Sequence, residues 1–342
     1  MRVQFEQWLA WLTRQVHSLT PDVVRKRLTW QHWRHLEPRL AKLARLVRPL
    51  IPEVLRQRLA GRYWKHRVSQ VAARARLIDR PTPPDPARLR TRLREAGLPP
   101  VPFKIDRANF EAFRAAARYG LRPYYEYGLQ PNAIEKYLEH YVSTQLLALE
   151  KGQSHVYIDL AANDSPMTEI VTDLYGIRSF RQDITYPAGV RGNSIGGDAC
   201  QLPLPDGFAT RLTLHCSFEH FEGDRDVRFL REAMRILRPG GRLCILPLYL
   251  ANAYHILTNP LLDLSGLVFE ADAAVHCGQD ISVRYARYYD VPHLMSRIAA
   301  NRGSLGMTLY EVTNAQDVHQ DCDLRFSLLF QKSLRRAATM GR

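Results

Sequence analysis

The sequence predicts an α/β protein with a mainly parallel sheet, and two observations in residues 155–250 support this class. Segments typical of strands and helices alternate there, as they do where crossover helices join parallel strands. In addition, the first strand-like segment, residues 155–160, carries Asp159 near its end and is followed at once by a turn and a helix start. Open α/β sheets bind ligands at the carboxyl ends of their strands, so we expect a ligand site at this edge.

The elements that follow have clear start and stop signals. Ser165 is expected to cap the next helix, with Pro166 as its first residue and Gly176 as its end. Residues 184–194 are few and contain Pro and Gly, so a loop is expected where a crossover helix would normally stand. Apolar residues spaced i, i+3, i+7 and i+10 then predict a buried crossover helix over residues 227–237.

Segments on either side supply candidate ligand contacts. Residues 134–147 should form a helix that packs near the carboxyl edge of the sheet, so Tyr137, His140 and Tyr141 are candidates to contact a ligand. Core packing is the alternative for each of them. Downstream, residues 250–285 form a long insert of the kind that often supplies a substrate lid. Further substrate candidates flank this insert, again with core packing as the alternative: Tyr249, Arg287 and Tyr288.

The first hundred residues differ in kind from the rest. They hold 22 Lys or Arg against 7 Asp or Glu, and all five Trp lie among the first 64 residues. Apolar residues at helical spacing predict basic amphipathic helices over 40–50 and 54–77, followed by a Pro-rich linker near 81–86. Three interpretations stay open: a helical extension packed on the main domain, a membrane-surface helix attracted to anionic lipid, or a nucleic-acid-binding arm.

Composition excludes several other classes of protein. No apolar run reaches the roughly 18–20 residues that cross a bilayer, and the first residues lack the pattern of a signal peptide. The 5 cysteines are scattered without a paired spacing, which suits a reducing compartment. We therefore expect a cytoplasmic protein, with peripheral contact at the inner face of a membrane if the basic arm binds lipid. The His, Cys and Asp near residues 276–280 and 319–323 lack a recognised ligand spacing, so no metal site is expected.

Three motifs indicate more specifically which kind of α/β protein this is. They are LPLPDGF at residues 202–208, SFEHF at residues 217–221 and FLREAMRILRPGGRL at residues 229–243. In this order and spacing they resemble the class I S-adenosylmethionine (SAM) dependent methyltransferases, especially the branch that acts on small molecules. The resemblance covers about residues 135–250. It implies a Rossmann-like mixed sheet of seven strands with helices on both faces, whose last two strands lie at 307–312 and 324–332.

The resemblance also implies domains and cofactor residues. The chain would consist of a basic helical extension, residues 1–100, and a methyltransferase domain, residues 101–335, with its core at 150–250. Asp183 would accept hydrogen bonds from the ribose hydroxyls of SAM, and Asp198 from the adenine amino group. The implied cofactor residues are Asp159, Ala161, Asn163, Asp183, Asp198, Ala199 and His215.

The turn after the first strand departs from the family pattern Asp-x-Gly-x-Gly-x-Gly. Ala161, Asn163 and Ser165 stand at the glycine positions. Asn tolerates positive φ better than most residues, so the turn can form around a tighter pocket. The departure keeps a second hypothesis open, in which the protein has lost SAM and acts as a non-catalytic binding or scaffold protein.

A methyl acceptor and a base complete the first hypothesis. An acceptor oxygen needs a group that takes its proton, and the candidates are His215, Glu219 and His220, although the last two can be structural. Residues 247–250 do not match the Asn/Asp-Pro-Pro-Tyr signature of enzymes that methylate amino groups of nucleic-acid bases or glutamine. We therefore expect a small-molecule, glycan or lipid-linked acceptor.

Overall fold

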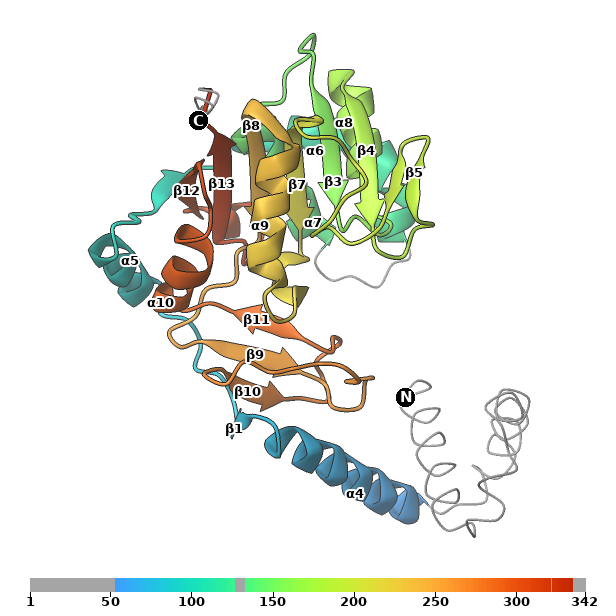
Figure 1. Ribbon diagram of the computed structural model, residues 1–342, viewed down its shortest axis with the longest axis vertical. Coiled ribbons are helices and arrows are strands. Elements are labelled where there is room, and N and C mark those ends of the chain that lie inside the picture. The colour runs from blue at the N-terminus through green and yellow to red at the C-terminus, as the bar shows by residue number, and fades with distance from the viewer. Residues whose placement is uncertain (1–52, 127–132, 321, 335–342) are drawn as a thin grey trace, which may run out of the picture. The chain divides into compact units, whose positions relative to one another are not determined.

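The computed structural model describes residues 53–126, 133–320 and 322–334 (Figure 1). The chain forms two compact units, one of Met1–Pro81 with Ile256–Tyr285 and the other of Thr82–His255 with Ala286–Arg342. The first segment of the first unit ends at Pro81, and the predicted division into residues 1–100 and 101–335 stays a prediction. The basic helix predicted over 40–50 lies outside the described residues.

The second unit contains a mixed sheet of nine strands, where seven were predicted. In spatial order the strands are β2 (Val101–Phe103), β12 (Leu305–Val312), β13 (Phe326–Lys332), β8 (Leu237–Leu246), β7 (Ala209–His215), β3 (Val156–Leu160), β4 (Arg178–Asp183), β6 (Ser194–Gly196) and β5 (Gly189–Arg191). The two additional strands are β2 and β5, which pair with β12 and β6 at the two edges. Each has 3 residues, too few to show the alternation that marks a strand in sequence.

The centre of this sheet is parallel, and the parallel pairing brings several strand ends together. β3 pairs with β4 and β7, β4 pairs with β6, and β7 pairs with β8, all in parallel. Asp159, Asp183 and His215 therefore lie at or beside strand ends on one edge of the sheet. The predicted antiparallel pair of last strands is confirmed by β12 and β13, next to β8.

Helices cover both faces of the sheet. They are α5 (Pro86–Glu95), α6 (Arg107–Glu126), α7 (Ala133–Leu146), α8 (Met167–Tyr175), α9 (Arg225–Ile236), α10 (Val291–His293) and α11 (Ala315–Val318), with the π-helical η3 (Leu294–Ala299). Tyr157 belongs to a core that it shares with residues of α6, α7 and α8. Its neighbour Ile158 is equally buried but points to the opposite face, where α9 crosses the strands in Figure 1.

The segment after β3 forms the predicted helix, but the helix begins one residue later than predicted, with Pro166 as its N-cap and Met167 as its first residue. Ser165 Oγ accepts a hydrogen bond from the Met167 N–H at 3.3 Å, and Pro166 stands just before the first helical residue of α8. Gly176 ends the helix with φ 67°, a left-handed conformation that glycine adopts without a steric penalty. The segment after β4 contains no helix, as predicted; instead it forms the small hairpin of β5 and β6.

The described part of the first unit is a helix with a small sheet. It contains α4 (Glu53–Ala72), β1 (Arg76–Ile78) and β10 (Ala274–Cys277), and β10 is followed in its sheet by β9 (His255–Thr258). Arg67 of α4 donates to the carbonyl of Leu262 at 2.7 Å, which ties the helix to the insert. The helix predicted over 54–77 is confirmed for most of its length, but its end gives way to β1.

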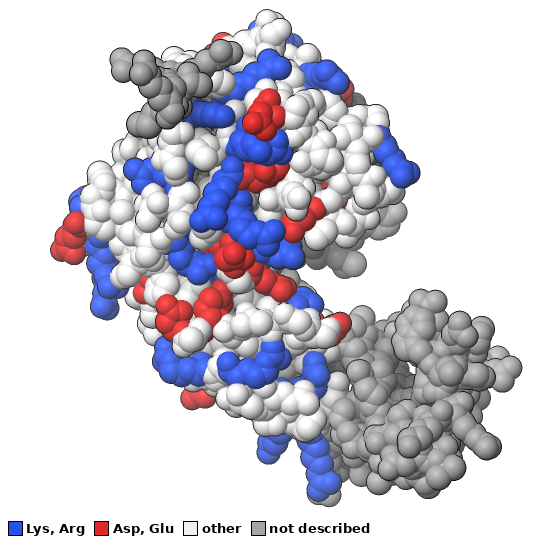
Figure 2. Space-filling view, in the orientation of Figure 1, with Lys and Arg blue, Asp and Glu red and all other residues white. Residues whose placement is uncertain are grey.

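Charges of both signs share the face drawn in Figure 2, where Lys and Arg gather over α9 with acids among them. On α4 the side chains of Arg62 and Lys65 are exposed. No helix within the described ranges is long and apolar enough to cross a membrane.

Candidate active site

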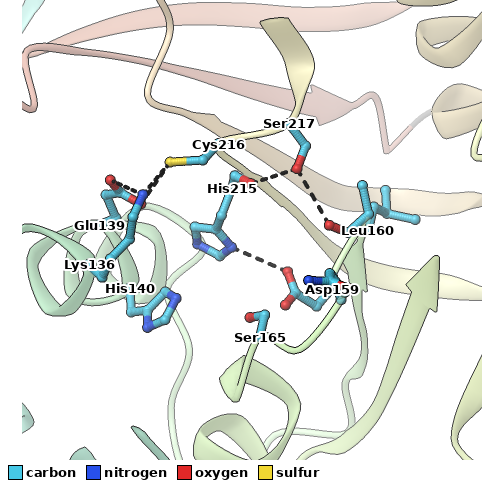
Figure 3. Close-up of a pocket in the computed structure, with 12 residues that line it drawn as sticks. Lys136, Glu139, His140, Asp159, Leu160, Ser165, His215, Cys216 and Ser217 are labelled. Carbon is cyan, nitrogen blue, oxygen red and sulfur yellow. Dashed lines mark hydrogen bonds and ion pairs between the residues drawn. The ribbon is translucent and has the colours of Figure 1, made fainter. Parts of the chain in front are cut away.

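A cavity of about 190 Å³ opens at the carboxyl edge of the sheet in the second unit. Residues 159–163 and Ser165, in the turn after β3, line one side of it, and residues 215–217 after β7 line another. Figure 3 shows Lys136, Glu139 and His140 reaching in from α7. The ligand site expected at this edge of the sheet therefore corresponds to a real cavity.

The turn after β3 adopts the expected backbone despite its lack of glycine. Ala161 and Asn163 have φ angles of 49° and 44°, in the left-handed region that glycine normally occupies. Gln182 Oε1 accepts a hydrogen bond from the Ala161 N–H at 3.2 Å, and Asp183 Oδ2 accepts one from the Asn163 N–H at 2.9 Å. Hydrogen bonds from β4 thus offset the steric strain that the two Cβ atoms add.

His215 is held from both sides of its ring. Its Nδ1 lies 3.2 Å from Asp159 Oδ1, and its Nε2 lies 3.1 Å from Ser143 Oγ. These three side chains have the connectivity of a Ser–His–Asp triad. Ser143, however, is fully buried, is absent from the cavity lining and donates to the His140 carbonyl at 2.8 Å. The Ser143 hydroxyl therefore orients His215 and is not placed to attack a ligand.

Asp159 has one oxygen engaged and one without a partner. Oδ1 accepts a hydrogen bond from the Thr213 hydroxyl at 2.8 Å and also faces His215. Oδ2 is buried and has no hydrogen-bond partner among the described residues. A buried polar atom without a partner costs free energy, so a ligand that brings a donor or a positive charge to this oxygen would be bound favourably.

Lys136, Glu139 and Cys216 form a second polar group on the α7 side of the cavity. The Lys136 ammonium donates to the two Glu139 oxygens at 2.9 and 3.0 Å and also contacts the Cys216 sulfur, whose thiol donates to Glu139. Burial lowers the pKa of Lys136, but the Glu139 carboxylate outweighs it, so the net pKa is raised and the lysine stays charged. Burial, and then Glu139, raises the pKa of Cys216, which therefore stays a neutral thiol.

His140 lies against His215 but has a nitrogen without a partner. The two rings meet edge to face with 5.0 Å between their centroids, and His140 Nδ1 is buried with no partner in the described chain. Burial lowers the pKa of His140 well below its ordinary value, and the neighbouring His215 and Lys136 lower it further. The His140 imidazole is therefore neutral at physiological pH.

The two acids assigned to ribose and adenine lie near strand ends, as predicted, but both already have partners. Asp183 is buried, and its Oδ1 accepts from the N–H and the hydroxyl of Thr185 at 2.9 and 2.8 Å. Asp198 Oδ2 pairs with Arg225 at 3.0 Å, and Ala199 beside it is buried. Neither acid lines the cavity, so their roles toward a cofactor stay predictions.

Of the three candidate bases, His215 alone lines the cavity. Glu219 is buried in the short turn η2 (Phe218–His220), where burial raises its pKa. Its Oε1 lies 3.5 Å from Nε2 of His220, whose side chain is 39% exposed. The pair is thus outside the cavity wall, as expected if it is structural.

Two of the predicted substrate residues belong to the apolar core instead. Tyr141 is 3% exposed and contacts Phe110 edge to face, and Tyr137 packs against the same core. Each stands one residue along α7 from a residue that lines the cavity. Because successive helix residues are turned by about 100°, that single step moves a side chain from the cavity to the core. Neither tyrosine lines the cavity, which favours core packing, and their substrate role stays a prediction.

Arg287, also predicted to bind substrate, is fully buried in an ion pair. Its Nη1 lies 2.7 Å from Asp226 Oδ2, and Asp226 also pairs with Arg297 at 2.7 Å. Burial raises the pKa of Asp226, but the two guanidinium groups outweigh it, and the net pKa is lowered. Arg287 has no exposed surface and does not line the cavity, so its substrate role stays a prediction without support from its burial. Its charged partner lies in a distant part of the sequence, which pattern reasoning does not connect.

Tyr249 and Tyr288, the remaining substrate candidates, form an aromatic pair. Their ring centroids are 5.1 Å apart, and His255 stacks on Tyr288 with 4.8 Å between centroids. Burial, and then the nearby Cys216 and Glu219, raises the pKa of Tyr249. This link to Cys216 places Tyr249 near one wall of the cavity, and the substrate role of the pair stays a prediction.

Sequence reasoning pointed to His140 but missed Lys136 and Glu139, which also line the cavity from α7. With the buried Ser143 these residues are spaced i, i+3, i+4 and i+7, which puts four polar residues on one face of a helix whose other face is apolar. This spacing is visible in the sequence and predicts a polar face on the helix. A second missed feature is Ile184, which directly follows Asp183 and is 63% exposed.

No group of three or more His, Cys, Asp or Glu is arranged to hold a metal ion in the part of the chain that the structure describes.

The chain resembles one family model and several solved structures. Residues 142–245 match the family model described as a methyltransferase domain. The 1,6-didemethyltoxoflavin-N1-methyltransferase of Burkholderia thailandensis, solved with 1,6-didemethyltoxoflavin and S-adenosylhomocysteine, is 15% identical, with a TM-score of 0.39 over 69% of this chain and 95% of its own. The geranyl diphosphate C-methyltransferase of Streptomyces coelicolor is 11% identical, with a TM-score of 0.35 over 60% and 83% of the two chains. No curated protein matches the chain.

α/β proteins bind nucleotides and related ligands at the carboxyl ends of their parallel strands, where the cavity of this protein also lies. The family match makes the assignment specific: residues 142–245 are a SAM-dependent methyltransferase domain. The methyl donor of such a domain is SAM. This match favours the catalytic hypothesis over a non-catalytic scaffold.

Proposed function

We propose that the protein transfers a methyl group from SAM to an oxygen of a small-molecule, glycan or lipid-linked acceptor in the cavity at the ends of β3 and β7. One observation carries the proposal: the unpartnered oxygen of Asp159 and the left-handed turn at Ala161 and Asn163 face the same cavity. The choice of oxygen rests on the imidazoles of His140 and His215 in that cavity, because a hydroxyl acceptor must give up a proton.

The residues of the site fit SAM. Its ammonium and sulfonium groups are cationic, and Asp159 Oδ2 is a buried acceptor that lacks a partner within the described chain. Asp183 accepts three hydrogen bonds within the chain, while a carboxylate offers about four acceptor positions, so it retains capacity for a ribose hydroxyl. Ile184, beside it, would offer its exposed apolar surface to the adenine ring.

The protein's main contribution to such a reaction is positioning. SAM, when bound, supplies a methyl group on a positively charged sulfur that leaves as a neutral thioether. Because the transfer is an in-line displacement, the acceptor oxygen must be held close to the methyl carbon on the side away from the sulfur. The face of α7 with Lys136 and His140 lies across the cavity from the turn in Figure 3 and would hold the acceptor there.

Calorimetric titration with SAM and with S-adenosylhomocysteine tests the cofactor assignment. We expect both to bind the wild-type protein, and we expect Asp183→Asn to weaken binding about tenfold or more, since charged acceptors contribute roughly 1.5–3 kcal/mol. Asp173→Asn is the matched control, because Asp173 is an exposed carboxylate on α8. An absence of binding to the wild type, or equal binding by Asp183→Asn, contradicts the proposal.

An unidentified acceptor can be found by following the methyl group itself. Extracts of the source cells would be incubated with the protein and SAM labelled in the methyl group, then separated by mass. We expect label in a small molecule, glycan or lipid-linked fraction at an alkali-stable ether. Label confined to nucleic acid or to protein would contradict the acceptor class.

We further propose that the protein is cytoplasmic and that residues 1–80 contact the inner face of an anionic membrane. The basic composition of this region and the exposed Arg62 and Lys65 on α4 support the proposal. Co-sedimentation with vesicles of phosphatidylcholine and phosphatidylserine tests it. We expect Arg62→Glu with Lys65→Glu to reduce binding, and the matched pair Arg107→Glu with Lys151→Glu, exposed in the second unit, to leave it unchanged.

A further inference from the structure

The cavity contains two imidazoles, and they differ in what their nitrogens already contact. Both nitrogens of His215 have partners, Asp159 Oδ1 at 3.2 Å and Ser143 Oγ at 3.1 Å. A ligand could reach a His215 nitrogen only by displacing one of them. His140, in contrast, is 2% exposed and has Nδ1 buried with no partner in the described chain, although the residue lines the cavity.

We propose that His140, through Nδ1, is the catalytic base that takes the proton from the methyl acceptor, and that His215 is a positioning residue. The inference rests on the proposed function. As the bond between acceptor oxygen and methyl carbon forms and the carbon–sulfur bond breaks, the acceptor O–H proton moves to His140 Nδ1. One neutral hydroxyl becomes one neutral methyl ether, and the positive charge that leaves the sulfur appears on the His140 imidazole.

One electrostatic effect on His140 changes in favour of this proton transfer during the reaction. The charged or titratable groups that face His140 are Lys136 and Glu139 on its own helix, Asp159 at the end of β3, and His215 with Cys216 after β7. Burial and the positive neighbours keep His140 neutral before the reaction. A sulfonium in the same cavity adds to that effect, and its loss during methyl transfer removes it. The basicity of His140 therefore rises as the proton arrives.

The effect of the sulfonium on the pKa of His140 can be measured without knowing the acceptor, by comparing the complex with SAM, which carries a sulfonium, and the complex with S-adenosylhomocysteine, which carries a thioether. Protein labelled with ¹⁵N in its histidines would be titrated from pH 8 down to the lowest pH at which it stays folded, in complex with SAM and, separately, with S-adenosylhomocysteine. For a unit charge 5–10 Å from His140, we expect the pKa of His140 to be lower in the SAM complex by about one to two units. His155, at the opposite end of β3, is the internal control and should titrate alike in both complexes.

The His140 signal would be assigned by its loss in His140→Asn, or in His140→Gln if the first variant does not fold. Equal titration of His140 in the two complexes, or a His140 that is already protonated at neutral pH in the SAM complex, would overturn the inference. Failure of SAM to bind at all would instead remove the proposed function, so the two failures are distinguishable.

Activity provides a second readout. With the labelled fraction from cell extract as acceptor, we expect His140→Asn to lower methyl incorporation at saturating SAM about 10²-fold or more, while its affinity for SAM stays within a factor of three. His155→Asn is the matched control, because His155 is a partly buried histidine outside the cavity. Undiminished incorporation by His140→Asn would also contradict the assignment.

Discussion

Nδ1 of His215 lies 3.2 Å from Oδ1 of Asp159, so the ends of β7 and β3 are joined by side chains as well as by their backbone pairing. This contact fixes the imidazole ring and, at the same time, leaves the second Asp159 oxygen without a partner within the described chain. One carboxylate thus orients a cavity residue and presents an acceptor to a ligand.

Asp159→Asn and Ser143→Ala should affect methyl transfer to very different extents. Asp159→Asn removes the negative charge from the cavity as well as the acceptor that holds His215, so we expect a loss of about 10²-fold or more in methyl incorporation. Ser143→Ala removes only the contact at Nε2, and we expect a loss within tenfold. Single-turnover transfer from labelled SAM measures both. If Ser143→Ala abolished transfer, the hydroxyl would have a chemical role that its full burial argues against.

Ala161→Gly should stabilise the protein, although most substitutions by glycine destabilise. Ala161 has φ 49°, where a Cβ costs roughly 1–2 kcal/mol, and the entropy cost of glycine is about 0.5–1 kcal/mol. We therefore expect a net gain of about 0.5–1 kcal/mol in the free energy of unfolding, measured with urea. Ala162→Gly, one residue along and without a positive φ, should instead lose about 0.5–1 kcal/mol. Equal losses in the two variants would mean that the turn is not left-handed at Ala161.

Asp226→Asn should destabilise the second unit strongly. It leaves the fully buried Arg287 and the partly buried Arg297 without their shared carboxylate. Removing one member of a buried ion pair costs about 3–5 kcal/mol, because the remaining charge is uncompensated. Denaturant unfolding measures this loss. Asp224→Asn, two residues away and exposed, should change stability by less than about 0.5 kcal/mol.

Glu219→Gln should stabilise the protein at neutral pH but not in acid. Burial raises the pKa of Glu219, so the folded state binds its proton more tightly than the unfolded state does. The contribution of that proton to stability is present below the ordinary pKa of 4.5 and is lost as pH rises through the raised pKa of the folded state. Glutamine avoids this loss. Melting temperatures should thus coincide near pH 4 and diverge in favour of Glu219→Gln toward pH 8, and a constant difference across this range would contradict the assignment.

The order of the central elements could be predicted because it depends on local patterns. The end of β3 at an acid, the capping of α8 near Ser165 and its termination at Gly176 are each set by residues adjacent in sequence. The edge strands β2 and β5 could not be predicted in the same way. Each is stabilised by pairing with a strand elsewhere in the chain, and has too few residues to show periodicity of its own.

The candidate site was predictable where it lies on strand ends and unpredictable where it lies on a helix face. His215 and Asp159 line the cavity because the topology of a parallel sheet requires it. Tyr137 and Tyr141 do not, because the sequence shows that α7 has two faces but not which of them meets the ligand. The burial of Arg287 could not be predicted for a different reason: it depends on Asp226, a partner that no local pattern reveals.

The two faces of α7 have a consequence for how the enzyme could change its substrate. Lys136, Glu139 and His140 line the cavity, while Leu138 and Val142, interleaved with them, are fully buried in the core. The cavity-facing positions can therefore be exchanged without repacking the hydrophobic interior. α7 offers a short, rigid segment on which directed evolution could select new acceptors, provided that Lys136 and Glu139 are exchanged together, because they form an ion pair in which Glu139 is buried.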